Sequence, residues 1–384
     1  MSESGYDIFR PPAHPWAALS ELRELCPVHR STNGSMHVVG FDSVTRALNT
    51  PEVFSSRSPR PPAEGETEQL VHLDGVAHTR ARRLVNKALP KREMARAQPW
   101  VEEIARDLLT PHLTTGEFDL VTVLSQPLPA IVFFRLLGVP AQDRERFIGW
   151  ADDAVHYSWR SEEPPSHADF VAYIQERIRL CRETPTDDIL SALVHSTHDG
   201  DRLSDDELVA FIRILIIAGT ETTTNAISTL FHQLLSQPEL WAKVRDDATL
   251  RPVAVEEALR FDPPLSWVPR VAAEMTEFAG VEIPAGGIVA LDLASANHDP
   301  AKYADPDTFR LDRSKDEPMM TTFGVGAHFC LGAPLARAEL KGVLDVACDL
   351  VPDLHLADGY EFAPRGPVMM RGAKSLPVCF TPRV

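Results

Sequence analysis

Apolar positions recur every three to four residues along most of the chain, the pattern of amphipathic helices. The pattern predicts helices over 15–25, 41–49, 78–89, 99–113, 119–137, 141–157, 167–182, 189–195, 204–237, 239–246, 254–261 and 333–340. Short runs bounded by turn residues predict strands only over 36–39, 268–272, 278–282 and 288–293. We therefore expect a mainly α fold with small β-sheets.

One predicted helix is unusually long. Ser204 suits an N-cap, and Glu207 three residues later completes a capping box. Apolar periodicity then continues until Pro238 stops it, so the helix would be about 45 Å long. A helix of this length is long for a globular protein.

Length and composition bound the architecture. The chain has 384 residues, of which 44% are hydrophobic, so it can bury a large core. No linker divides it, and we expect a single domain over 1–384. The N-terminus lacks a signal pattern, no apolar run approaches the length of a membrane span, and five scattered cysteines suit a reducing compartment. These features predict a soluble, cytoplasmic protein without a membrane partner.

The net charge of the chain restricts the kinds of partner that it can bind. The net charge of −17 argues against a nucleic-acid partner. One segment is an exception, because between His78 and Glu93 all charged residues are cations: Arg80, Arg82, Arg83, Lys87, Lys91 and Arg92. Such a run is usually a solvated helix face, but in an acidic protein it can also steer an acidic partner.

The most informative segment lies near the C-terminus. Residues 323–332 read Phe-Gly-Val-Gly-Ala-His-Phe-Cys-Leu-Gly, and a helix with Pro334 in its first turn follows. The glycines allow close approach of the backbone to a flat ligand, and the helix N-terminus stabilises a thiolate at Cys330. The alternative is that Cys330 is a buried apolar residue without chemistry.

This segment resembles the ligand loop of cytochromes P450 of the bacterial soluble type. The resemblance implies the cytochrome P450 fold, with haem b bound through the thiolate of Cys330 to its iron. It also places Phe323, Gly324 and Gly332 in the cofactor-binding loop.

A second informative segment lies inside the long helix. Residues 218–224 read Ala-Gly-Thr-Glu-Thr-Thr-Thr, and glycine and threonine are weak helix formers. These residues invite a local bulge or an inserted water, or they are only a tolerated weak spot. The segment resembles the family's oxygen-binding motif. By that resemblance Ala218 lies against the cofactor, Thr222 orients dioxygen and Glu221 relays protons, and an acid beside an alcohol suits the delivery of protons.

Charged residues elsewhere match family positions. Glu257 and Arg260 share a helix face at i, i+3, as in the structural Glu-x-x-Arg pair of the family. The resemblance further assigns four counter-charges to the haem propionates, since buried carboxylates need partners. These are His78, Arg82, Arg270 and His328.

The resemblance also suggests a substrate pocket of mainly apolar residues, which favours a hydrophobic or aromatic organic molecule. The candidate lining residues are Ile214, Ala218, Trp267, Val268, Val368 and Met369. Arg213 lies about half a turn out of phase with Thr222, so we expect a structural ion pair there, with a substrate-carboxylate anchor as the alternative.

Together these features predict a monooxygenase that inserts one oxygen atom from O2 into its substrate, most simply by hydroxylation. Electrons would come from a ferredoxin and an NAD(P)H-dependent reductase. The ferredoxin would dock on the basic run together with Arg337 and Lys341. The alternatives are a cytochrome P450 that performs coupling, desaturation or another tailoring step, and a non-catalytic haem-binding sensor.

Overall fold

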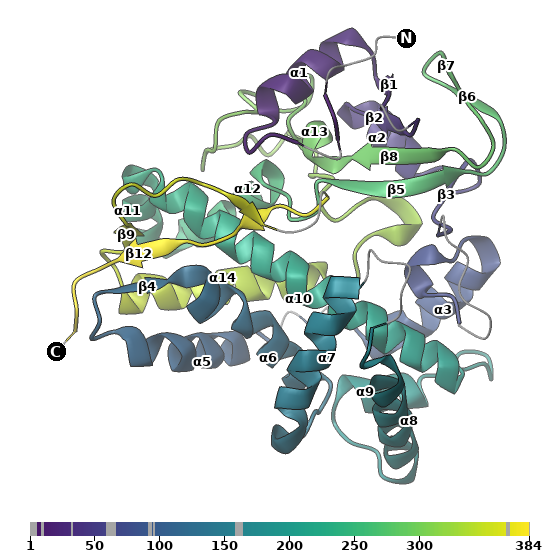
Figure 1. The fold of residues 1–384 in the computed structure, drawn as a ribbon, viewed down its shortest axis with the longest axis horizontal. Coiled ribbons are helices and arrows are strands. Elements are labelled where there is room, and N and C mark those ends of the chain that lie inside the picture. Colours follow the sequence, from purple (N-terminus) through teal and green to yellow (C-terminus); the bar gives the residue numbers. More distant parts are fainter. Residues whose placement is uncertain are drawn as a thin grey trace.

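The structure is a computed structural model that describes residues 6–8, 11–31, 34–58, 67–90, 94, 97–157, 164–365 and 369–383. Helices dominate it (Figure 1). They are α1 Trp16–Leu25, α2 Phe41–Leu48, α3 Gly75–Ala88, α5 Gln98–Leu109, α6 Pro127–Leu136, α7 Arg144–Tyr157, α8 His167–Glu183, α9 Ile189–His195, α10 Asp205–Leu235, α11 Pro238–Asp246, α12 Arg251–Phe261, α13 Leu293–Asn297 and α14 Ala333–Leu350.

The largest sheet has five strands in the order β1-β2-β8-β5-β3, all antiparallel except the parallel pair β2 and β8. Its strands are β1 Val28–Arg30, β2 Met36–Val38, β3 Phe54–Ser55, β5 Trp267–Ala272 and β8 Ile288–Asp292. The smaller sheets pair β4 Glu117–Asp119 and β9 His355–Leu356 with β12 Pro377–Cys379, β6 Thr276–Phe278 with β7 Val281–Ile283, and β10 Pro364–Arg365 with β11 Gly372–Ala373. The expected mainly α fold with small sheets is confirmed.

The long helix α10 is the spine of the fold. The capping box is present: the Ser204 hydroxyl accepts from the Glu207 N–H at 3.1 Å, and the Ser204 N–H donates to the Glu207 carboxylate at 2.8 Å. In Figure 1 α10 passes between the five-stranded sheet with α1 at the top and helices α8 and α9 at the bottom. The largest apolar cluster packs around its second half, against α5, α6, α12 and α14.

Of the alternatives for the Ala218–Thr224 segment, a bulge is not found. The helix runs for 31 residues without interruption through this segment. The hydroxyls of Thr220 and Thr222 donate to the carbonyls of Ile216 and Ala218, four residues earlier, at 2.8 and 2.6 Å. Both hydroxyls are therefore satisfied within the helix, and the backbone stays helical.

Three sequence predictions were wrong in detail. The single helix over 119–137 is instead β4, a π-helical turn η3 at Val121–Ser125, and α6. The strand over 278–282 is a hairpin, because Ala279 and Gly280 have φ of 51° and 77° and turn the chain between β6 and β7. The helix after Cys330 is longer than predicted and ends at Leu350.

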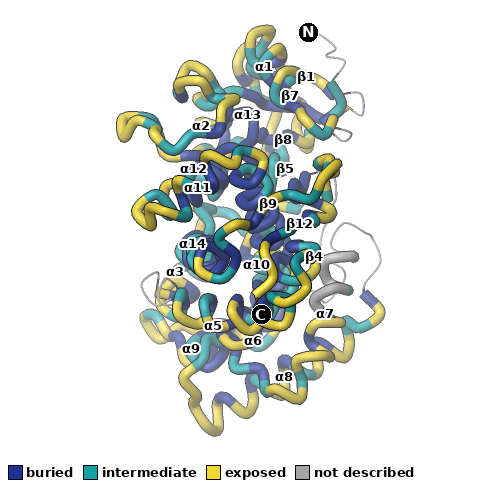
Figure 2. The backbone as a smooth tube through the Cα atoms, turned by 90° about the vertical axis from the view of Figure 1, so that its left-hand side faces the viewer, coloured by how far each residue is buried: buried dark blue, intermediate teal, exposed yellow. Residues whose placement is uncertain are grey.

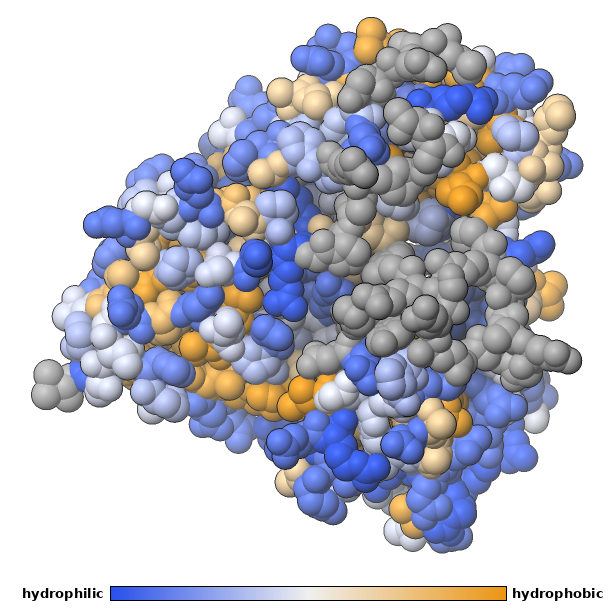
Figure 3. All heavy atoms as spheres, viewed as in Figure 1, coloured by the Kyte–Doolittle hydropathy of each residue, from blue (hydrophilic) through white to orange (hydrophobic). Residues whose placement is uncertain are grey.

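The distribution of buried and exposed residues agrees with this arrangement of helices and strands. Figure 2 shows dark blue, buried backbone along α10 and the central strands, and yellow, exposed backbone on α8 and the peripheral loops. The face visible in Figure 3 is mainly hydrophilic, with smaller apolar areas between the charged side chains. Among the described residues no helix has the length and apolarity needed to cross a bilayer.

Candidate functional site

The Cys330 loop directly precedes α14 and has a tight conformation. Gly324 and Gly326 have φ of 68° and 74°, which favours glycine. A Cβ on Gly326 would also lie 2.6 Å from Asn49 Oδ1. The Cys330 N–H donates to the Phe323 carbonyl at 2.9 Å and closes the loop. Gly332 has φ of −80°, and a Cβ there would lie 3.9 Å from Cys330 Sγ.

Opposing effects act on the Cys330 thiol. Burial raises its pKa, whereas the backbone N–H groups of Gly332 and Ala333 at the start of α14 lower it. Arg82 and Arg337 lower it further by their positive charge. The N-terminus of α14, Arg82 of α3 and Arg337 of α14 therefore offset part of the effect of burial on the sulfur.

The structure brings together the four residues that the sequence suggested as counter-charges. The rings of His78 and His328 lie 4.1 Å apart, and burial together with His78 and Arg270 lowers the pKa of His328 to about 4. Burial lowers the pKa of Arg270 to about 10, and its Nη1 donates to the Pro269 carbonyl at 2.7 Å. Arg82 donates to the Phe329 carbonyl next to Cys330. The cluster thus combines two partly buried guanidinium groups with two histidines whose pKa burial lowers.

One carboxylate in the cluster was not anticipated. Asp74 lies 3.5 Å from His328 Nε2 and lowers the net positive charge there. The Ser55 hydroxyl and the Ser56 N–H donate to Asp74 at 2.5 and 3.1 Å. His78 Nε2 is buried and has no hydrogen-bond partner among the described residues. The signal in the sequence was a single acid, Asp74, directly before the basic helix.

The oxygen-motif segment combines accessible and buried residues. Ala218 is exposed although it lies at the middle of α10, and Thr222 is partly exposed. Glu221 is only 7% exposed, and its Oε2 has no partner among the described residues. Burial raises the pKa of Glu221, and the positive charge of Arg365 on β10 acts in the opposite direction. The segment thus places a buried acid next to an accessible alcohol.

A second buried acid approaches the same segment from α14. Burial raises the pKa of Glu339 to about 8, and the Thr223 hydroxyl donates to its Oε2 at 3.4 Å. Sequence reasoning missed Glu339. The available signal was its helical spacing from Leu335 and Val343, since a carboxylate at a core position of a helix is unusual.

Glu257 and Arg260 form a buried bidentate pair with both bonds at 2.8 Å and both side chains 3% exposed. Arg313 adds a contact of 2.6 Å to the same carboxylate. Arg260 also donates to the carbonyls of Asn297 and Pro306 at 2.8 and 3.0 Å. The pair therefore ties α12 to the chain segment that precedes the Cys330 loop.

The candidate substrate residues fall into separate groups. Trp267 and Met369 belong to one apolar cluster, whereas Ile214 packs in another with α7 and α8. Val268 is partly buried, and Val368 lies outside the described residues.

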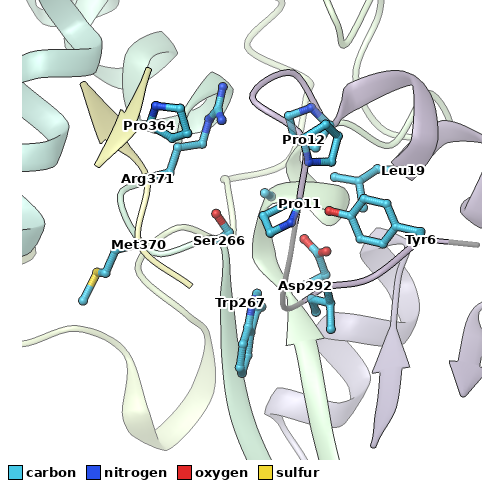
Figure 4. Close-up of a pocket in the computed structure, with 13 residues that line it drawn as sticks. Tyr6, Pro11, Pro12, Leu19, Ser266, Trp267, Asp292, Pro364, Met370 and Arg371 are labelled. Carbon is cyan, nitrogen blue, oxygen red and sulfur yellow. The ribbon is translucent and has the colours of Figure 1, made fainter. Parts of the chain in front are cut away.

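Trp267 also lines a small cavity of about 40 Å³ between the N-terminal segment and the sheet. Figure 4 shows the Tyr6 hydroxyl and the Asp292 carboxylate directed into this cavity, opposite Trp267 and Ser266. Arg213 lies elsewhere, beside Trp150 and Phe170.

Much of the basic run is engaged within the protein. Arg80 pairs with Asp201 and Glu207, each at 2.6 Å, while Arg337 pairs with Glu256 and Lys341 with Asp345. The exposed cations Arg83 and Lys87 contact His198 at 3.2 Å and the Thr197 carbonyl at 2.7 Å. Lys91 and Arg92 lie outside the described residues.

Comparisons with known proteins agree with this geometry. The family model described as Cytochrome P450 matches residues 166–346. A steroid C26-monooxygenase of Mycobacterium tuberculosis is 34% identical over 374 residues, 95% of this chain and 94% of that protein. A vitamin D(3) 25-hydroxylase of Pseudonocardia autotrophica is 39% identical over 320 residues, 83% and 79% of the two chains.

Solved structures give the same result. The structure of cytochrome P450 CYP109Q5 from Chondromyces apiculatus superimposes with a TM-score of 0.91 at 32% identity and covers 98% of each chain. Near-complete coverage at this identity includes the Cys330 loop, α10 and the sheet in one common architecture. The chain belongs to the cytochrome P450 family of monooxygenases, the bacterial members of which it resembles over almost its whole length.

Proposed function

We propose that the protein binds haem b through Cys330 and inserts one oxygen atom from O2 into a hydrophobic small molecule, most simply by hydroxylation. The observation that carries the proposal is the position of the Cys330 thiol at the N-terminus of α14, together with Arg82, Arg270 and the paired rings of His78 and His328.

The residues present fit a haem. Its two propionates need donors, and Arg82, Arg270, His78 and His328 supply them around the single acid Asp74. The unpartnered Nε2 of buried His78 can donate to such a carboxylate. Ala218 is exposed in the middle of α10, between partly buried neighbours, which supports a ligand plane against this turn.

When bound, a thiolate-ligated haem supplies the activation of dioxygen that the insertion requires. The chain's own residues have three tasks. Gly332, Ala333, Arg82 and Arg337 favour the anionic form of the Cys330 sulfur against the effect of burial, which raises its pKa. Thr222 presents a hydroxyl beside the accessible face of α10, and Glu221 next to it provides a carboxyl group whose pKa is raised by burial.

For the substrate we propose a steroid-like or secosteroid-like molecule. The names of the two relatives above refer to steroid and vitamin D hydroxylation, and this chain is similar to both over most of its length. Ile214 and Ala218 would present an apolar wall, which suits a molecule of few polar groups.

For the electron donor we propose a ferredoxin that docks on the exposed face of α3. Arg83 and Lys87 support this because they are exposed and make no ion pair with a carboxylate among the described residues. Arg80, Arg337 and Lys341 are neutralised by partners within the chain, so they contribute less than the sequence alone suggested. A compact pair of cations on an acidic protein would orient an acidic partner.

A ligand screen followed by turnover tests the substrate proposal. Steroids, secosteroids, fatty acids and macrolides are added to the ferric protein, and the Soret shift reports displacement of water from the iron. Compounds that shift the band are incubated with a surrogate ferredoxin and reductase, and the products are identified by mass spectrometry. We expect a steroid or secosteroid that gains one oxygen atom; a Soret shift and oxygenation confined to another class would overturn this substrate assignment.

A further inference from the structure

The imidazole of His298, directly after α13, faces an oxygen atom at each of its two ring nitrogens. The residue is 0% exposed. Its Nδ1 lies 2.7 Å from Oδ1 of Asp307, and its Nε2 lies 2.8 Å from the carbonyl oxygen of Phe261. A carbonyl and a carboxylate only accept hydrogen bonds, so both nitrogens have to donate. A neutral imidazole carries one N–H and an imidazolium carries two, so this geometry requires the charged ring.

A proton on Asp307 is the alternative source of the second donor. A neutral carboxyl group could donate to Nδ1 of a ring that is protonated at Nε2 only. The Asp307 side chain is 47% exposed, and its bond to His298 lowers its pKa. A carboxyl group that is partly hydrated and has a lowered pKa is ionised at neutral pH. The proton between the two side chains therefore belongs to His298.

Burial opposes the positive charge on the ring. Burial is the largest effect on the pKa of His298 and lowers it, as does the charge of Arg260, which is itself paired with Glu257. The bonds to Asp307 and to the Phe261 carbonyl raise the pKa. The two bonds outweigh burial, because a neutral ring would hold a lone pair against an acceptor at hydrogen-bond distance.

The other charged groups around this ring come from α1 and from the start of the loop after α13. The positive charge of Arg23 on α1 interacts with Asp299 and Asp307. The Asp299 carboxylate accepts from the N–H groups of Phe41 and Ala301 at 2.8 and 2.9 Å. Asp307 is thus the acid that contacts the ring, and Arg23 adds a second cation near the same carboxylate.

The ring of His298 is stacked on the first residue of α1. Its centre lies 4.0 Å from that of Trp16, with an angle of 7° between the planes. The guanidinium of Arg371 lies 5.0 Å from the centre of the Trp16 ring, and Arg371 is paired with Asp262. Arg371 also donates to the Ala13 carbonyl at 2.8 Å. Because cations are attracted to the face of an indole, a charged His298 binds Trp16 more strongly than a neutral ring does.

The segment that leads into α1 covers one side of the five-stranded sheet. Ile8 and Tyr6 pack in the apolar cluster of Trp267 and Met369. The same segment lines the small cavity in Figure 4 with its tyrosine and prolines. The contacts of Trp16 therefore hold a segment that shields Trp267 and its neighbours.

We propose that His298 is protonated at both ring nitrogens in the folded protein and acts as a pH-sensitive latch: its charge holds Trp16 and the N-terminal segment on the core, and loss of one proton at alkaline pH loosens them. Deprotonation removes the bond to Asp307 or the bond to Phe261 and weakens the stack on Trp16. The latch does not depend on the proposed function.

The charge is tested by nitrogen NMR of the reduced, carbon monoxide-bound holoprotein, which is diamagnetic, with 15N-labelled histidine. The signals of His298 are identified by their loss in His298→Arg or, if that variant does not fold, by their shift in Asp307→Asn. At pH 7.5 we expect the two similar shifts of an imidazolium. A strongly downfield, unprotonated nitrogen at this pH overturns the proposal.

Unfolding at several pH values gives an independent test. The folded pKa of His298 should exceed the value of about 6.5 in the unfolded chain, so its contribution to stability is complete below that value and is lost as pH rises through the folded pKa. Above pH 6.5 the unfolding equilibrium constant of the wild type should therefore rise up to about tenfold per pH unit relative to His298→Gln and His298→Arg. The titration of Glu339 is common to these proteins and cancels. Exposed His355→Gln is the control, and its ratio to the wild type should stay constant above pH 7.

A ratio that changes only below pH 6.5, as for a buried neutral ring, overturns the charge assignment, and so does a ratio that is constant throughout. Hydrogen exchange of α1, corrected for the intrinsic rate, tests the latch. Between pH 7 and pH 9 its protection should fall about tenfold in the wild type and persist in His298→Arg, which keeps the charge. If protection of α1 is unchanged in the wild type, or is lost equally in His298→Arg, the charge does not hold the segment.

Discussion

The imidazole ring of His78 lies 4.1 Å from that of His328, with an angle of 33° between the planes. One ring comes from α3 and the other from the Cys330 loop, so the contact joins two segments far apart in sequence. Burial lowers the pKa of both rings, and each is lowered further by a neighbouring cation, Arg82 for His78 and Arg270 for His328. Both rings are therefore neutral at pH 7 until an anion arrives.

Arg270→Gln should weaken haem binding by about 10- to 100-fold, because it removes a charge-assisted bond from a buried carboxylate. Arg270→Lys should retain part of the affinity, since it keeps the charge but not the planar fork. The rate of haem transfer to an acceptor protein measures the effect. Arg106→Gln, which changes an exposed arginine, should release haem as wild type does, and equal release by Arg270→Gln would contradict the propionate assignment.

Charge reversal on α3 tests the docking face. Arg83→Glu combined with Lys87→Glu should slow reduction by the ferredoxin about tenfold at low salt and flatten the dependence on ionic strength. Stopped-flow reduction at several salt concentrations measures both. Lys243→Glu places a reversed charge on exposed α11, well away from α3 in Figure 1, and should leave the rate unchanged. If the α3 and α11 variants behave alike, α3 is not the docking face.

The buried pair of Glu257 and Arg260 predicts a large loss of stability. Arg260→Ala leaves Glu257 in the core with Arg313 as its remaining cation, and it removes the bidentate pair and the bonds from Arg260 to the carbonyls of Asn297 and Pro306. We expect a loss of about 3 to 5 kcal/mol in the free energy of unfolding, measured as the denaturant midpoint of the holoprotein. The control Arg179→Ala removes the exposed partner of Glu176 and Glu183 on α8 and should leave the midpoint unchanged. If Arg260→Ala unfolds at the same denaturant midpoint as the wild type, the pair does not stabilise the fold.

The free energy of unfolding of Glu339→Gln should differ from that of the wild type by an amount that depends on pH. Burial raises the pKa of Glu339 from 4.5 to about 8, so the folded protein keeps a proton that the unfolded chain loses above pH 4.5. Its contribution to stability is complete below the unfolded pKa and is lost as pH rises toward 8. Relative to wild type, Glu339→Gln should therefore gain up to ~1.4 kcal/mol per pH unit between these values.

Unfolding curves at several pH values measure this gain. Glu282→Gln on the exposed β6–β7 hairpin supplies the control, because its difference from wild type should not vary with pH. If the difference in free energy of unfolding between Glu339→Gln and wild type is also the same at every pH, Glu339 is ionised in the folded protein.

The elements that sequence predicted correctly carry their information locally. The start of α10 follows from Ser204 and Glu207, which bond to one another in the structure as the capping box requires. The helix over 119–137 failed because its apolar run masks the transition from β4 to η3, where Asp119 binds the N–H of Val121 at 2.9 Å. Apolar spacing alone does not reveal a change from one backbone geometry to another.

The residues of the site likewise divide into those with a local signal in the sequence and those whose roles depend on distant contacts. The loop of Cys330 was identifiable because its glycines and cysteine lie within ten residues. Asp74 and Glu339 were missed because their roles depend on residues distant in sequence, His328 for one and Thr223 for the other.

The most direct test of the central claim is the absorption spectrum of the reduced, carbon monoxide-bound protein. We predict the red-shifted Soret band that a thiolate ligand gives, its loss in Cys330→Ser, and its retention in Cys379→Ser, which changes a partly exposed free cysteine of β12. A wild-type protein without that band, or a Cys330→Ser variant that keeps it, would contradict the assignment of Cys330 as the haem ligand.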